Sequence, residues 1–196
     1  LGRPAEALRM AEEAQKIWMK VGDRGAEVEA TIVEASAKLA LIETQGQASS
    51  GVSLRVLQLA KAAVNAAETF RSRDGACLGA AHLCHARATS MLGSWVNAED
   101  SARRAAKAFR RQGDMRRRAE ALLICADACV KRGYLQDARA DAARALDLFE
   151  RVGDSDGTAR VAGVYDSIQR ALGLPTQAEL EEQRRRELEW QQRQLA

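Results

Sequence analysis

The sequence predicts an all-α protein made of stacked helix pairs, and its composition, glycine spacing and alanine spacing all indicate this class. The 196-residue chain is 46% hydrophobic and 29% charged, yet only 4% aromatic, with 2 prolines. Strong helix formers dominate, whereas the strand-forming valine, threonine, tyrosine and phenylalanine are scarce. This composition excludes a β-sandwich and a disordered proline-rich tail.

Glycines at a fixed interval define a repeat. The Gly-Asp pairs are Gly22 with Asp23, Gly113 with Asp114 and Gly153 with Asp154, with Arg73 and Asp74 as a degenerate copy, and a second series has Gly93, Gly133 and Gly173. Each series repeats every 40 residues where it is regular, and the two are offset by 20. Two helices of about 17 residues therefore fill each unit, because glycine tolerates the left-handed dihedral angles that end a helix. The aspartate that follows is placed to cap the next helix.

This spacing predicts about nine helices, over residues 3–20, 24–45, 54–71, 75–92, 95–112, 115–132, 135–152, 155–172 and 177–194. One interval is irregular, because Asp23 and Asp74 are 51 residues apart. We assign the excess to a polar turn at 45–51 and to an extended helix before it. The insertion is either a tolerated surface loop or part of a binding face.

Small and aromatic side chains follow the same period. Alanines at helical spacing are Ala7, Ala11 and Ala14, then Ala98, Ala102 and Ala105, then Ala138, Ala142 and Ala145. Such stripes let two helices approach closely. One large aromatic side chain stands near the end of each such helix, namely Trp18, Phe70, Phe109, Phe149 and Trp190. We expect each aromatic to fill the gap between its own unit and the next.

These helix pairs resemble tetratricopeptide (TPR) repeats. Gly133 and Ala138, five residues apart, match the family's turn between helices, and the first-helix packing positions match Leu122, Cys125, Ala126 and Cys129. The 40-residue period with Gly-Asp linkers is similar to the long-linker repeats of kinesin light chains and Leu-Gly-Asn-type adaptors. The chain departs from the pattern where His82 and His85 replace large apolar residues. The resemblance implies a right-handed α-solenoid of antiparallel helix pairs.

The resemblance also divides the chain into units. Residues 1–175 are expected to be TPR-like repeats, with a half repeat at 1–22 and units at 23–73, 74–113, 114–153 and 154–175. Residues 176–196 are expected to form a polar helix that either caps the array or docks on another subunit. As a cap, this helix would cover the preceding unit with Leu180, Leu188 and Trp190.

Sequence motifs for catalysis or cofactor binding are missing, so we expect no enzyme, no cofactor and no metal. The one cluster of metal-binding residue types contains Cys77, His82, Cys84 and His85, with Cys125 and Cys129 one repeat later. Cys77 and Cys84 stand about 10 Å apart along a helix, too far to ligate one zinc ion. A three-ligand site of His82, His85 and Cys125 stays open, but buried thiols and packed histidines are the favoured interpretation.

Charge and cysteine content point to the cell interior. The net charge of +3 is too small to indicate nucleic acid or membrane without a concentrated patch. The apolar runs fall far short of the roughly 18 residues that a membrane span needs, and no signal peptide or other targeting signal is visible. The cysteine spacing favours a reducing compartment, either cytoplasm or an organelle interior. We expect the sequence to belong to a larger chain or complex.

The resemblance implies that partners bind in a concave groove lined by the first helix of each pair. In that register the groove-facing residues are Leu83, Arg87 and Met91, then Glu120, Leu123, Asp127 and Lys131, then Arg160, Ser167 and Arg170. These residues predict a mixed, mildly basic groove that suits an extended or helical peptide, possibly with acidic residues. The Lys/Asn pattern that clamps a C-terminal carboxylate in some family members is not seen.

A possible basic contact patch is formed by Arg103, Lys107 and Arg110, spaced at i, i+4 and i+7. The stripe is a solvated helix face, a contact for an acidic protein, or a site for RNA or anionic lipid. Apart from Phe109, aromatic residues for base stacking are missing nearby, so we expect no nucleic acid.

Two functions fit this sequence. The first is a non-enzymatic scaffold or adaptor that binds a partner protein on the concave face. The alternative is a structural or assembly subunit held permanently in a larger multiprotein complex.

Overall fold

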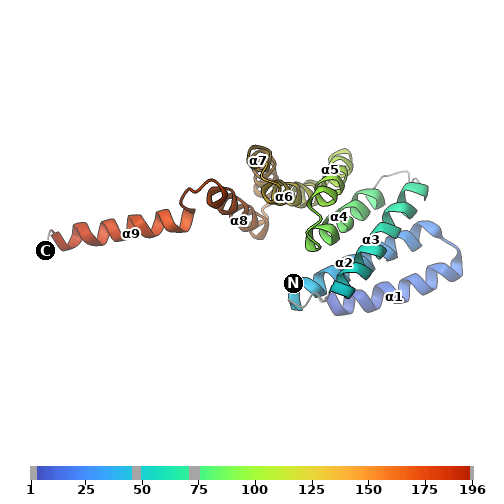
Figure 1. Cartoon of the computed structure of the whole chain (residues 1–196). Coiled ribbons are helices and arrows are strands. Elements are labelled where there is room, and N and C mark those ends of the chain that lie inside the picture. Colours follow the sequence, from blue (N-terminus) through green and yellow to red (C-terminus); the bar gives the residue numbers. More distant parts are fainter. Residues whose placement is uncertain (1–3, 46–49, 71–75, 195–196) are drawn as a thin grey trace.

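The computed structural model describes residues 4–45, 50–70 and 76–194, and within these ranges the chain forms nine α-helices and no strand (Figure 1). They are α1 (Pro4–Val21), α2 (Arg24–Gln45), α3 (Ser50–Phe70), α4 (Ala76–Met91), α5 (Trp95–Gln112), α6 (Met115–Lys131), α7 (Leu135–Val152), α8 (Ser155–Ala171) and α9 (Gln177–Gln194). The predicted all-α solenoid of about nine helices is confirmed.

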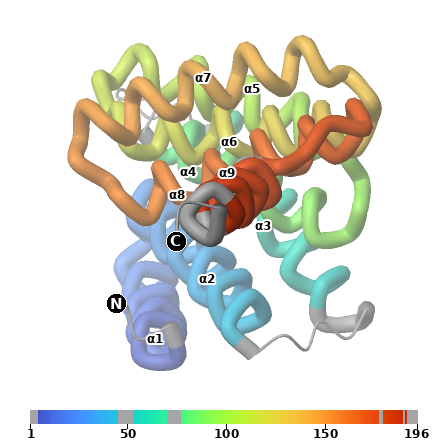
Figure 2. The backbone as a smooth tube through the Cα atoms, turned by 90° about the vertical axis from the view of Figure 1, so that its left-hand side faces the viewer, coloured from blue at the N-terminus to red at the C-terminus, as the bar shows by residue number. Residues whose placement is uncertain are grey.

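The helices stack in chain order from α1 to α8 (Figures 1 and 2). Each odd-numbered helix from α3 to α7 packs between two even-numbered ones, and each even-numbered helix also contacts the next even one, as α2 with α4, α4 with α6 and α6 with α8. The even-numbered helices therefore form a close inner row. The odd-numbered helices stand outside it, which curves the stack with the even row on its concave side.

The turns between helices form as the glycine spacing predicts. Six glycines of the two series have φ between 68° and 79°, namely Gly22, Gly93, Gly113, Gly133, Gly153 and Gly173. At the end of α5, the N–H of Asp114 donates to the carbonyl of Phe109 across Gly113. The Asp114 carboxylate then accepts the N–H of Arg117, at 2.9 Å, and caps α6. Asp23 and Asp154 cap α2 and α8 in the same way, whereas Asp74 lies outside the described residues.

The irregular interval is built differently from the prediction. We expected a polar turn over 45–51, but α2 includes Gln45 and α3 already begins at Ser50. The two helices are 22 and 21 residues long, whereas the other seven described helices have 16 to 18. Part of the extra sequence thus lengthens this helix pair, with Ser50 and Gly51 in the first turn of α3.

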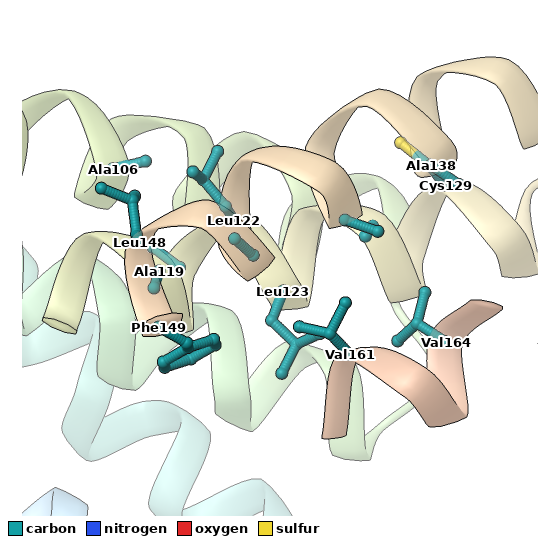
Figure 3. Close-up of a cluster of buried hydrophobic side chains, with 14 of the residues drawn as sticks. Ala106, Ala119, Leu122, Leu123, Cys129, Ala138, Leu148, Phe149, Val161 and Val164 are labelled. Atoms are coloured by element: carbon teal, nitrogen blue, oxygen red, sulfur yellow. The ribbon is translucent and has the colours of Figure 1, made fainter. Parts of the chain in front are cut away.

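Two of the five aromatic residues fill gaps between units as predicted. Phe149, seen in Figure 3, is fully buried. It lies against Gly157 of α8. Phe109 is fully buried as well, between Gly79 of its own unit and the guanidinium of Arg117 in the next, 5.9 Å from its ring centre. The prediction is wrong for the other two aromatics that the structure describes, since Trp18 is 36% exposed and Trp190 is 63% exposed. The side chain of Phe70 lies outside the described residues.

Helix α9 points away from the stack (Figure 1). Its Leu180, Leu188 and Trp190 are 37%, 59% and 63% exposed, so the prediction that they cover the preceding unit is wrong. The reason is physical, because most residues of this helix are polar, and its few apolar residues do not form one continuous stripe that folding back could bury. Ion pairs along the helix, such as Glu182 with Arg186, support it instead.

Candidate protein-binding groove

A groove of about 680 Å³ runs along the even-numbered helices. It is lined by Glu43 of α2, by Leu83, Arg87, Ser90 and Met91 of α4, by Glu120, Leu123, Ile124 and Asp127 of α6, and by Arg160 and Val164 of α8. Every lining residue therefore comes from the inner row. The groove lies on the concave side of the stack and crosses four successive units.

The floor of the groove is apolar. Leu83 and Leu123 occupy equivalent positions 40 residues apart and are 8% and 5% exposed. Leu123 lies beside Val161 and Val164 of α8, which extends the floor into the next unit (Figure 3). Two successive units thus each place a leucine where a partner's apolar side chain can be buried, whereas the equivalent position in α8 is Gly163.

Charged side chains border this floor. The guanidinium of Arg87 pairs with the Glu43 carboxylate at 2.5 Å and ties α4 to α2. Among the described residues, Glu120, Asp127 and Arg160 line the groove and form no salt bridge. Burial raises the pKa of Asp127, although the nearby Lys131 opposes this shift. The centre of the groove is therefore acidic and its α8 end basic.

Seven of the ten residues predicted to face the groove line it: Leu83, Arg87, Met91, Glu120, Leu123, Asp127 and Arg160. Ser167 does not, since its hydroxyl donates to the carbonyl of Gly163 on its own helix. Lys131 does not, because it lies in the last turn of α6 with its ammonium 6.0 Å from the ring centre of Trp95. Arg170 does not either, since it donates to the carbonyl of Asp166 and the hydroxyl of Ser167 on its own helix. With three carboxylates and two guanidinium groups, the lining has an excess of one acidic group instead of being mildly basic. That these residues contact a partner stays a prediction.

Sequence reasoning missed four lining residues: Glu43, Ser90, Ile124 and Val164. Ile124 and Val164 stand 40 residues apart, each one helical turn after Glu120 or Arg160. The repeat register alone was enough to find them. Glu43 had no such signal, because it lies near the end of the extended helix that breaks the period.

The predicted basic stripe of Arg103, Lys107 and Arg110 does not form one surface. Arg103 belongs to an ion network between helices, with its Nε 2.9 Å from Glu99 and its Nη2 3.5 Å from Asp141 of α7. Burial raises the pKa of Asp141, and Arg103 opposes this shift. Arg132 also pairs with Glu99. Lys107 and Arg110 take no part in this network, and they line a different hollow.

The cysteines and histidines lie within the packed helices. Cys84, Cys125 and Cys129 are buried free thiols, and burial raises the pKa of Cys129 to about 11. The Nδ1 of His85 is hydrogen bonded to the Ser101 hydroxyl at 2.8 Å. Cys125 approaches the carbonyl of Glu99 at 3.9 Å. In the ranges that the structure describes, no three His, Cys, Asp or Glu side chains gather closely enough to hold a metal ion.

The buried histidines predict acid sensitivity. Burial is the main cause that lowers the pKa of His82 and of His85 below 6.5. The unfolded chain then takes up protons first, so the free energy of unfolding should fall as the pH drops below about 6.5 towards the folded-state pKa values. Urea unfolding between about pH 8 and pH 5.5 measures this slope. A double variant His82→Gln with His85→Gln should show a shallower slope, and an unchanged slope would contradict the assignment.

None of the described helices combines the length and the apolar character needed to cross a membrane.

Comparison with known proteins identifies the fold. No family model and no curated protein matches the sequence. Among solved structures, the chain is similar to BtubC (BKLC) from P. vanneervenii, a bacterial kinesin light chain-like helical repeat protein, with a TM-score of 0.58 and 20% identity. The match covers 87% of this chain and 66% of that one. A de novo designed helical repeat protein matches at a TM-score of 0.41 and 22% identity, over 86% and 89% of the two chains. The chain is thus a helical repeat protein.

Proposed function

We propose that the chain is a non-enzymatic protein-interaction scaffold of the TPR type that holds a segment of a partner protein in its concave groove. One observation carries this proposal: along one inner row of helices, the groove has an apolar floor and three charged groups that form no salt bridge among the described residues. Charged groups beside an apolar floor fit a segment that supplies both apolar side chains and complementary charges. The 40-residue period with Gly-Asp turns supports the TPR type.

The order of charges along the groove defines the partner segment. An extended or helical peptide would place apolar side chains over Leu83 and Leu123, and a basic side chain towards Glu120 and Asp127. An acidic side chain of the same segment would meet Arg160. The apolar floor contributes affinity, whereas the charges fix the direction and register of the peptide.

Charge reversal on the groove tests this proposal. Glu120→Lys with Arg160→Glu leaves the net charge unchanged, and so does the control Glu150→Lys with Arg139→Glu on the outer helix α7. Quantitative mass spectrometry after affinity capture from the native source should recover the same partner with the wild-type chain and the control. The groove variant should recover roughly tenfold less of it. Equal recovery by all three proteins would refute the groove as the binding site.

Helix α9 supports a second function, that of a subunit held permanently in a complex. Its Leu188 and Trp190 are large apolar side chains that stand in solvent, and docking on another subunit would bury them. In this case, Leu188→Glu with Trp190→Glu should release the chain from the complex during size-exclusion chromatography of cell extract. The groove variant should then stay in the complex, which distinguishes the two functions.

The cysteine thiols indicate the cellular compartment of the protein. The buried free thiols of Cys84, Cys125 and Cys129 fit a reducing compartment inside the cell.

A further inference from the structure

A second hollow, which we call the cationic cleft, lies between α5, α6 and α7. Its volume is about 550 Å³. It is lined by Lys107 and Arg110 of α5, Arg118 of α6 and Arg144 of α7, over a floor of Ala106 and Leu122. Three helices therefore bring four cations around one apolar floor.

The charge of the cationic cleft is largely uncompensated. Its lining contains no carboxylate. In the described part of the chain, Lys107, Arg110 and Arg118 have no ion-pair partner, and only Arg144 reaches a carboxylate, that of Asp141 at 3.3 Å. Four like charges around a shared hollow repel one another and create a positive potential. An anionic group in the cleft would relieve this repulsion.

The fold by itself does not require these cations. The equivalent position two units earlier, between α1, α2 and α3, also holds a hollow of about 550 Å³. Its charged lining residues are only Arg24 and Glu27, one of each sign, and the rest are neutral. The helical repeat thus creates the hollow, whereas the sequence adds the positive charge at one copy of it.

The cationic cleft and the groove face opposite ways. On α6, the cleft is lined by residues 118 and 122, and the groove by residues 120, 123, 124 and 127. At 3.6 residues per turn, the centres of these two sets lie roughly 170° apart around the helix axis. A ligand in the cationic cleft therefore leaves the groove free for a second one.

We propose that the cationic cleft binds an acidic, extended segment of a protein, rich in glutamate or aspartate. Guanidinium forks bind carboxylates in a bidentate manner, and the floor of Ala106 and Leu122 accepts the aliphatic part of a glutamate side chain. The cationic cleft is less suited to a nucleic acid, because base stacking needs accessible aromatic rings. The aromatic side chain of α5 closest in sequence to the cleft residues, Phe109, is fully buried.

Fluorescence anisotropy with a labelled oligoglutamate peptide of about ten residues tests this site. The wild-type chain should bind the peptide, and Lys107→Glu with Arg118→Glu should weaken binding roughly tenfold or more. The control Arg111→Glu with Arg139→Glu makes the same change in net charge on α5 and α7 outside the cleft. It should weaken binding less than about threefold.

Other outcomes would overturn the proposal. An equal loss of affinity for oligoglutamate in the cleft variant and the control would mean that the overall charge of the protein attracts the peptide. Failure of the wild-type chain to bind the peptide would exclude the site. Tighter binding of an oligothymidine, abolished by the cleft variant, would assign the cationic cleft to nucleic acid instead. The groove variant Glu120→Lys with Arg160→Glu should bind oligoglutamate normally, so this test can fail or succeed independently of the proposed function. Circular dichroism checks that each variant is folded.

Discussion

Replacement of Phe149 by alanine is expected to lower the free energy of unfolding by about 3–5 kcal/mol. The ring is fully buried at the end of α7 and packs with Val161 and Ile168 of α8 in one core cluster. Removal leaves a cavity at the boundary between two units, which rigid helices fill poorly. Urea unfolding followed by circular dichroism measures the loss.

A matched control lies three residues later on the same helix. Val152 is 40% exposed, so Val152→Ala should change the free energy of unfolding by less than about 1 kcal/mol. A loss below that value for Phe149→Ala as well would mean that the ring does not join the two units. Hydrogen exchange adds a local readout, because a stack with contacts only between neighbours should first lose protection in α8.

The glycine facing this ring should be intolerant of even one methyl group. A Cβ at Gly157 would lie 2.3 Å from Cδ1 of Phe149, and the ring has no free space to move into. Overpacking of this kind costs about 1–3 kcal/mol or more, which exceeds the gain of up to about 1 kcal/mol in helix propensity. Gly157→Ala should therefore destabilise the protein.

Two further glycines turn this prediction into a graded series. At Gly79 the added Cβ would meet the Phe109 ring at 3.0 Å, whereas at Gly163 nothing lies within 4 Å. Gly163→Ala should stabilise the protein by about 0.5–1 kcal/mol, because alanine favours the helix and meets no obstacle. Gly79→Ala should fall between Gly163→Ala and Gly157→Ala. Thermal or urea unfolding that ranks Gly157→Ala above Gly163→Ala in stability would contradict the packing around Phe149.

The sequence predicts local structure well wherever the repeat is regular. Gly113 and Asp114 show why, since a positive φ and an aspartate cap are set by neighbouring residues and recur with the period. Leu83 and Leu123 line the groove because the same register places them on the inner face. Period and helix geometry together thus predict most of the groove lining.

Some contacts between helices depend on how the stack curves, and the repeat period does not predict them. The pairing of Glu43 with Arg87 joins residues 44 positions apart, and that of Arg103 with Asp141 joins different units. Nothing in either local sequence indicates the partner. The orientation of α9 is a similar case, because a polar helix carries no apolar stripe to specify where it packs.

Because the inner row is closely packed and the outer helices stand apart from it, we expect the stack of helices to bend. Along this row, the buried Ala81 of α4 and Ala121 of α6 have no side-chain torsions to rearrange when helices slide. Small shear at each junction adds up over four units, so the span of the concave side can change by bending while each helix pair stays intact. A wider partner would bend the stack further on binding. The bent stack would store elastic energy, which would be released when the partner dissociates.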